Sequence, residues 1–203
     1  MKKQKLKFKK LMNEYRAESY ELKYVEEVLK DANADFEEYY QQFCTKKRVQ
    51  LGALKKKHAN RLQQIFASPP ALRNSVEKKL QQQEYDSKNL FRQIARKFHP
   101  DTIPLDDPRQ DDYAEVFKKA ANAIQEAKWG ELFDIAETHN LDLDEYDTVI
   151  KSLKADIQRV QSQIKKKKGT YAWLLYECET DQEKDEIIKR FLNHIYVDYQ
   201  DAT

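Results

Sequence analysis

Glycine and proline are scarce in this chain, which has three glycines and five prolines among 203 residues. Doubly wound folds, barrels and sandwiches connect their strands through many turns rich in these residues, so the composition argues against all three classes. A Gly-rich phosphate loop is also excluded, because Gly52, Gly130 and Gly169 lie far apart. We therefore expect an all-α fold.

Cysteine and histidine are also rare, with two and four residues respectively. Cys44 and Cys178 are too few for a disulfide framework, and they predict a reducing compartment, the cytoplasm. The four histidines share no Cys-x-x-Cys or His-x-x-x-His pattern, so the sequence predicts no metal site and no cofactor. It also has no apolar run of about eighteen residues, the length that predicts a membrane-spanning helix.

Charge is abundant instead. Charged residues make up 35% of the chain, and 37 Lys and Arg residues are balanced by 35 Asp and Glu residues. This balance argues against a strongly basic nucleic-acid binder but leaves room for local basic patches. An elongated helical protein needs only a stripe of apolar residues, so it suits this composition better than a compact globule does.

The prolines divide the chain into three parts, because all five lie between Pro69 and Pro108. The long stretches on either side are rich in good helix formers. We expect an N-terminal helical hairpin or coiled-coil arm at 1–70, a middle segment at 71–140, and a C-terminal coiled-coil and helical arm at 141–203.

The N-terminal arm carries one apolar seam at heptad-compatible spacing, interrupted by Glu18. Asp31–Asp35 predicts a break, with Asp35 as the N-cap of a second long helix that ends at Ser68-Pro69-Pro70. If the break turns the chain, the two helices form an antiparallel hairpin. The seam consists of Tyr15, Leu22, Val25 and Leu29, and the second helix carries Phe36, Tyr40, Phe43, Leu51, Leu54, Leu62 and Ile65.

The C-terminal arm holds the clearest heptad pattern, with apolar residues alternately three and four positions apart. We expect this stripe to pack within the chain or, alternatively, against a second copy in a homodimer. Thr180 and Glu183 form a capping-box pattern that opens a last helix. The stripe consists of Tyr146, Ile150, Leu153, Ile157, Val160 and Ile164.

The middle segment contains an amphipathic helix over 88–98. Its apolar residues fall within one arc, while Lys88, Arg92 and Arg96 form a row on the other side and Lys97 also lies outside the arc. Pro100 stops the helix, so His99 and Asp101 are held on a short, stiff turn. The apolar arc consists of Leu90, Phe91, Ile94, Ala95 and Phe98.

The string Leu90–Asp101 resembles the J-domain family of co-chaperones, whose pattern is an aromatic and basic amphipathic helix followed by His-Pro-Asp. The similarity continues in Phe117–Ile124, which resembles the family's next helix, and covers about 55 of the 203 residues. The wider layout resembles bacterial-type proteins with a reduced J-domain between coiled-coil arms, through Val49–Leu54 and Tyr171–Leu174. The family's first helix has no counterpart, although Val76 and Leu80 indicate a short substitute.

The resemblance implies docking on a DnaK-type heat-shock chaperone and stimulation of its ATP hydrolysis. The chain is then no enzyme itself, because the chemistry belongs to the partner. The arms are expected to provide placement or to bind a client or scaffold protein. The chaperone-binding residues that the resemblance and the basic row imply are Lys88, Arg92, Arg96, Lys97, His99, Pro100, Asp101 and Lys118.

Two alternatives belong to other classes. The first is a structural coiled-coil protein in which the His-Pro-Asp turn is vestigial. The second is a nucleic-acid-associated protein that uses the basic segment Lys2–Lys10. We favour a simpler interpretation of that segment, in which it is a frayed and solvated terminus.

Overall fold

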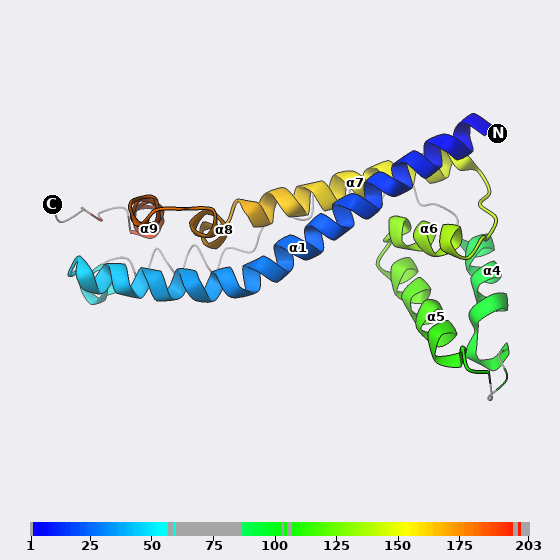
Figure 1. Ribbon diagram of the computed structural model, residues 1–203, viewed down its shortest axis with the longest axis horizontal. Coiled ribbons are helices and arrows are strands. Elements are labelled where there is room, and N and C mark those ends of the chain that lie inside the picture. The colour runs from blue at the N-terminus through cyan, green and yellow to red at the C-terminus, as the bar shows by residue number, and fades with distance from the viewer. Residues whose placement is uncertain are drawn as a thin grey trace. The chain divides into compact units, whose positions relative to one another are not determined.

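The computed structural model describes residues 2–56, 59, 87–102, 104, 107–196 and 199. Every regular element in these ranges is helical, and none of them contains a β-strand. The all-α prediction is therefore confirmed (Figure 1). No helix in the described ranges is long and apolar enough to cross a membrane.

Helix α1 (Lys2–Lys46) is continuous, so the predicted break at Asp31–Asp35 is wrong. The segment contains no glycine or proline, and the buried Ala32 continues the apolar stripe through it. The Asn33 amide donates back to the Leu29 carbonyl, a bond that a helix accommodates. The predicted hairpin depended on this break, and Phe36 instead lies inside α1.

The chain leaves the helix after Lys46, where Arg48 takes a positive φ of 52°. Residues 51–56 are helical again. The predicted end of the second helix at Ser68–Pro70 lies outside the described residues, as do Leu62, Ile65, Val76 and Leu80.

The structure divides into two compact units, each built from two separate segments of the chain. Unit 1 comprises Met1–Tyr20 and Lys78–Gln161, and unit 2 comprises Glu21–Glu77 and Ser162–Thr203. These groupings cross the boundaries near residues 70 and 140 that the sequence predicted. Both α1 and α7 (Tyr146–Lys168) contribute to both units.

Unit 1 contains α4 (Lys88–Phe98), the 3₁₀ turn η1 (Pro100–Thr102), α5 (Gln110–Gln125) and α6 (Trp129–Thr138). The first turns of α1 pack here through Phe8, whose ring meets Phe133 of α6 edge-on at 6.4 Å and Tyr146 of α7 at 5.8 Å. Lys2–Lys10 is therefore helical and anchored rather than frayed, although its lysines are exposed to solvent as predicted.

Gly130, at the start of α6, lies in a close contact between helices of unit 1. A Cβ atom at this position would lie 2.4 Å from ring atoms of the buried Tyr15. The Gly130 N–H donates to the buried Asp156 carboxylate at 2.7 Å, and Arg159 pairs with the same carboxylate at 3.1 Å. The absence of a side chain at Gly130 is what lets α1 approach α6 here.

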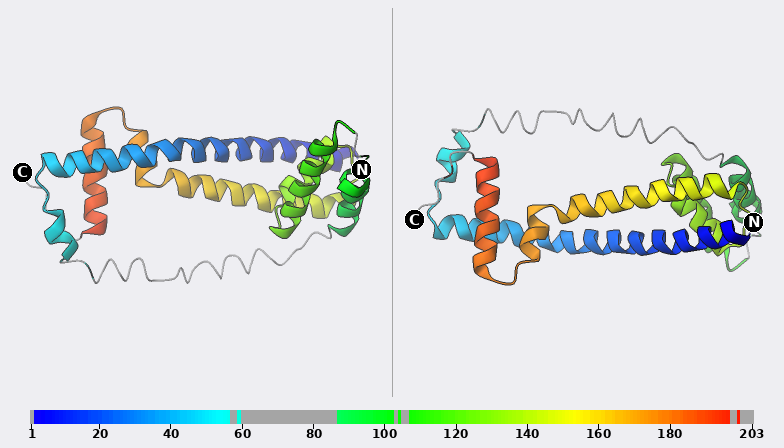
Figure 2. Two further views of the ribbon diagram at one scale, coloured as in Figure 1. Left: turned by 90° about the horizontal axis from the view of Figure 1, so that it is seen from below. Right: turned by 90° about the horizontal axis from the view of Figure 1, so that it is seen from above.

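Unit 2 contains α8 (Tyr171–Tyr176) and α9 (Asp181–Ile195), which runs across the C-terminal part of α1 (Figure 2). The predicted capping box is confirmed: Thr180 Oγ1 accepts from the Glu183 N–H, and the Glu183 carboxylate accepts from the Thr180 N–H. The core of the unit consists of Phe43, Cys44, Leu175, Ile187, Ile188, Leu192, Tyr196 and Tyr199.

The heptad stripe of α7 is buried within the chain itself. Leu153 is completely buried, and Ile150, Ile157, Val160 and Ile164 are each less than a tenth exposed. In unit 1, Gln161 on α7 donates to Glu18 on α1 at 2.8 Å. The stripe is thus covered without a second copy, and the homodimer remains a prediction.

Candidate functional site

Helix α4 separates its apolar and basic sides as the sequence predicted. Leu90, Ile94 and Phe98 are buried, and the helix packs against α5, which runs in the opposite direction (Figure 1). The small side chains of Ala120 and Ala123 on α5 are fully buried and allow a close approach. One side of α4 is therefore fixed, and the other side is presented to solvent.

The basic row lies on the solvent side. Lys88, Arg92 and Arg96 are all exposed. The guanidinium groups of Arg92 and Arg96 form no hydrogen bond or ion pair with the described part of the chain. Arg96 also lies in the last turn of α4, where a cation interacts favourably with the helix dipole. Arg92 and Arg96 are available to an acidic partner.

The His99-Pro100-Asp101 turn continues directly from this helix. His99 has an extended backbone with ψ of 131°, while its N–H still donates to Ala95 O at 3.0 Å. The His99 carbonyl accepts from both the Thr102 N–H at 2.9 Å and the Thr102 hydroxyl at 2.7 Å. These local bonds stabilise the turn, and its stiffness remains a prediction.

Two contacts of the His99 Nδ1 atom compete. It accepts the Asp101 N–H at 3.2 Å and lies 3.6 Å from the Asp101 carboxylate. We give the shorter contact priority, because Nδ1 cannot accept from the N–H while carrying a proton for the carboxylate. The Asp101 carboxylate is 87% exposed, so it faces solvent and is free to accept from a partner.

The His99 ring is positioned by aromatic packing across the helix pair. It meets Phe117 of α5 edge-on at 4.9 Å, and Phe117 in turn stacks on Phe91 of α4 at 5.8 Å. The imidazole keeps 40% of its side chain exposed. The sequence placed Phe117 in the region similar to the J-domain family, but nothing in its spacing showed that it supports the turn.

Lys97 has an internal partner that the sequence did not reveal. Its ammonium donates to the His139 carbonyl at the end of α6 at 2.9 Å, and the His139 ring packs on Phe98 at 4.6 Å. Partial burial and the neighbouring Lys97 charge lower the pKa of His139. Docking through Lys97 remains a prediction, but its ammonium already ties α4 to α6.

A second attachment joins α4 to the segment before α7. Gln93 exchanges two hydrogen bonds of 3.0 Å with the backbone of Asp142. Asn89 donates to the Asp144 carboxylate. These bonds link residues about 50 positions apart in the sequence, and they hold α4 laterally while leaving the basic row outward.

Three aspartates that follow the turn, Asp107, Asp111 and Asp112, stabilise the local structure. Arg109 pairs with Asp107 at 2.8 Å and lowers the pKa of that carboxyl to about 2. Asp111 and Asp112 lie in the first turn of α5, where negative charge stabilises a helix. On the same helix Lys118 is exposed, next to Phe117.

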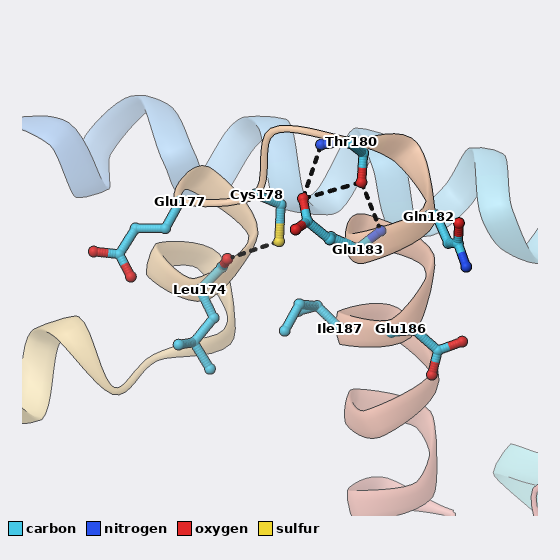
Figure 3. Close-up of a pocket in the computed structure, with 8 residues that line it drawn as sticks. All are labelled: Leu174, Glu177, Cys178, Thr180, Gln182, Glu183, Glu186 and Ile187. Atoms are coloured by element: carbon cyan, nitrogen blue, oxygen red, sulfur yellow. Dashed lines mark hydrogen bonds between the residues drawn. The ribbon is translucent and has the colours of Figure 1, made fainter.

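Unit 2 offers a pocket of about 580 Å³ where α8 meets α9 (Figure 3). The Cys178 thiol points to the Leu174 carbonyl at 3.1 Å, and burial raises its pKa. Glu183 is occupied by the capping box, and Glu186 pairs with Lys189 at 2.9 Å. Each of these polar groups therefore already has a partner close to it in the sequence.

Among the described residues, no three His, Cys, Asp or Glu side chains gather closely enough to hold a metal ion. Comparisons with known proteins gave no match among protein-family models, curated proteins or solved structures. The functional assignment therefore depends on the chemistry of the turn and of the basic row.

Proposed function

We propose that this chain is a co-chaperone or adaptor that docks on a DnaK-type heat-shock chaperone and stimulates its ATP hydrolysis. The observation that carries the proposal is the exposed Asp101 carboxylate at the end of the exposed basic row, on a braced helix pair. The resemblance of Leu90–Asp101 to the J-domain family supplies the identity of the partner.

The physical properties of the surface suit this role. An exposed cationic row accelerates encounter with an acidic groove and fixes the docking register. The stiff turn then presents Asp101 as a hydrogen-bond or ion-pair acceptor at little entropic cost. Such transient interfaces are small, often under about 1,200 Å², so a few residues dominate them.

The proposed docking surface consists of the basic row, the turn and the adjacent lysines. Arg92, Arg96 and Asp101 are its main members, because their charged groups are the most available. Lys97 would have to give up its bond to the His139 carbonyl, so we expect it to contribute less. The complete set is Lys88, Arg92, Arg96, Lys97, His99, Pro100, Asp101 and Lys118.

The test is single-turnover ATP hydrolysis by a DnaK-type chaperone with and without this chain. Stimulation should fall as salt is added, because the steering charges are exposed. Arg92→Glu or Arg96→Glu should slow association several-fold. Lys165→Glu is the matched control, since it reverses an exposed charge on α7 outside the proposed surface. Equal loss in that control would contradict the assignment.

A structural coiled-coil protein with a vestigial turn is the competing function. The buried α7 stripe and its pairing with α1 favour it, because both make the arms stable without any partner. The same ATPase experiment decides between the two, since a purely structural chain gives no stimulation at any concentration. Placement in a reducing compartment is a further part of the proposal, and the free thiols of Cys44 and Cys178 support it.

A further inference from the structure

The first turns of α1 carry a concentrated basic face that the proposed function does not use. Residues 2–10 contain six lysines and no carboxylate. Leu6 is 68% exposed, and four of the lysines lie three or four positions before or after it, which places them around it on one helix face. We call this the lysine face: Lys2, Lys3, Leu6, Lys9 and Lys10.

The opposite side of the same turns is anchored in unit 1. Phe8, Met12 and Tyr15 are buried there, and Phe8 contacts the rings of Phe133 and Tyr146. Because α1 is held by this apolar side, the lysine face is directed outward as a fixed surface. All six lysines are exposed.

The charge of the lysine face is not compensated within the described part of the chain, where none of the six lysines forms an ion pair. Two lysines of unit 2 are paired by contrast: Lys167 and Lys168 of α7 form ion pairs with Glu26 and Glu21 of α1 at 3.2 and 2.6 Å. Like charges three and four positions apart on a helix repel one another. A polyanion would relieve this repulsion.

We propose that the lysine face binds the phosphate backbone of a nucleic-acid duplex without reading its sequence. Its four lysines, spread over eight helical steps of about 1.5 Å, give roughly one charge per 3 Å, close to the one phosphate charge per about 3.4 Å along one strand of a duplex. Lysines act as point charges for phosphates and lack the planar fork with which arginine reads base edges.

Other anionic partners fit the surface less well. The lysine face has no aromatic side chain, so it offers no stacking platform for single-stranded bases. A membrane-binding helix inserts an apolar face, and here the apolar side of α1 is already buried in the protein, leaving only Leu6 outside. The binding is independent of the proposed chaperone docking, because it uses none of that surface.

The test is the anisotropy of labelled DNA and RNA duplexes of arbitrary sequence, titrated with the full chain at several salt concentrations. The logarithm of the affinity should fall as the logarithm of the salt concentration rises, with a slope of about −3 to −4, because each phosphate contact of the four lysines contributes about −0.9. Changing Lys2, Lys3, Lys9 and Lys10 together to Gln should reduce the slope by about 3 to 4 and weaken binding at least about tenfold.

The matched control changes Lys151, Lys154, Lys165 and Lys166 to Gln, four exposed lysines of α7 with the same total charge. It should bind the duplexes nearly as wild type does. The Lys9→Gln, Lys10→Gln double variant, measured in parallel, should lose about half of the effect and keeps the test valid if the quadruple variant unfolds. The proposal would be overturned by an equal loss of duplex affinity in the control variant or by a salt slope smaller than about 1 in magnitude. Tighter binding to phosphatidylserine vesicles than to duplexes would also overturn it.

Discussion

Replacing Gly130 by alanine should destabilise the protein, contrary to the usual effect of this change within a helix. In an ordinary helix, Gly→Ala is worth about 0.5–1 kcal/mol in favour of alanine. Here the new Cβ would lie 2.4 Å from ring atoms of Tyr15, whose side chain is buried. Overpacking of this kind costs about 1–3 kcal/mol, so the net change should be a loss of up to about 2.5 kcal/mol.

Gly52 provides the matched control, because a Cβ atom there would meet nothing within 4 Å and its backbone is helical. Gly52→Ala should be neutral or stabilising by up to about 1 kcal/mol. Urea denaturation followed by circular dichroism measures both variants. If Gly130→Ala is as stable as Gly52→Ala, the close approach of α1 to α6 is not a feature of the folded protein.

Three further predictions concern the core, a cap and a surface charge. Leu153→Ala should cost about 2–5 kcal/mol because Leu153 is fully buried, whereas the same change at the exposed Leu6 should alter the melting midpoint little; equal midpoints would place the stripe in solvent. Thr180→Ala should cost about 1 kcal/mol by removing the α9 cap, measured by urea denaturation, and no loss would argue against the capping box. Asp107 should titrate near pH 2 by NMR, so its contribution to stability is present above its unfolded pKa and is lost as the pH falls toward 2. Arg109→Gln should raise the pKa of Asp107, and an unchanged pKa would exclude the ion pair as the cause of the shift.

Regular apolar spacing made the helices and their buried sides predictable. The three-and-four spacing of the α7 stripe and the apolar arc of α4 identified residues that are largely buried. The helix break predicted at Asp31–Asp35 was wrong because it rested on the local preference of Asp and Asn for caps and turns. Burial of Ala32 and the absence of glycine or proline keep α1 intact instead.

The supports of the candidate site could not be predicted, because they join residues that are distant in the sequence. Lys97 reaches the carbonyl of His139, and Gln93 bonds to the backbone of Asp142, across 42 and 49 positions. The pairing of α1 with α7 is a contact of the same kind. A single sequence shows which residues are apolar or charged, but not which distant backbone group each will meet.

The measurement that tests the central claim most directly is ATPase stimulation by Asp101→Asn. The carboxylate is 87% exposed beyond a helix stop, so removing its charge should leave the circular dichroism spectrum unchanged. Because a few residues dominate small interfaces, we expect the variant to lose stimulation of a DnaK-type chaperone that the wild type shows. If Asp101→Asn stimulates hydrolysis as well as the wild type does, the His99-Pro100-Asp101 turn is not responsible for stimulation and the co-chaperone account is contradicted.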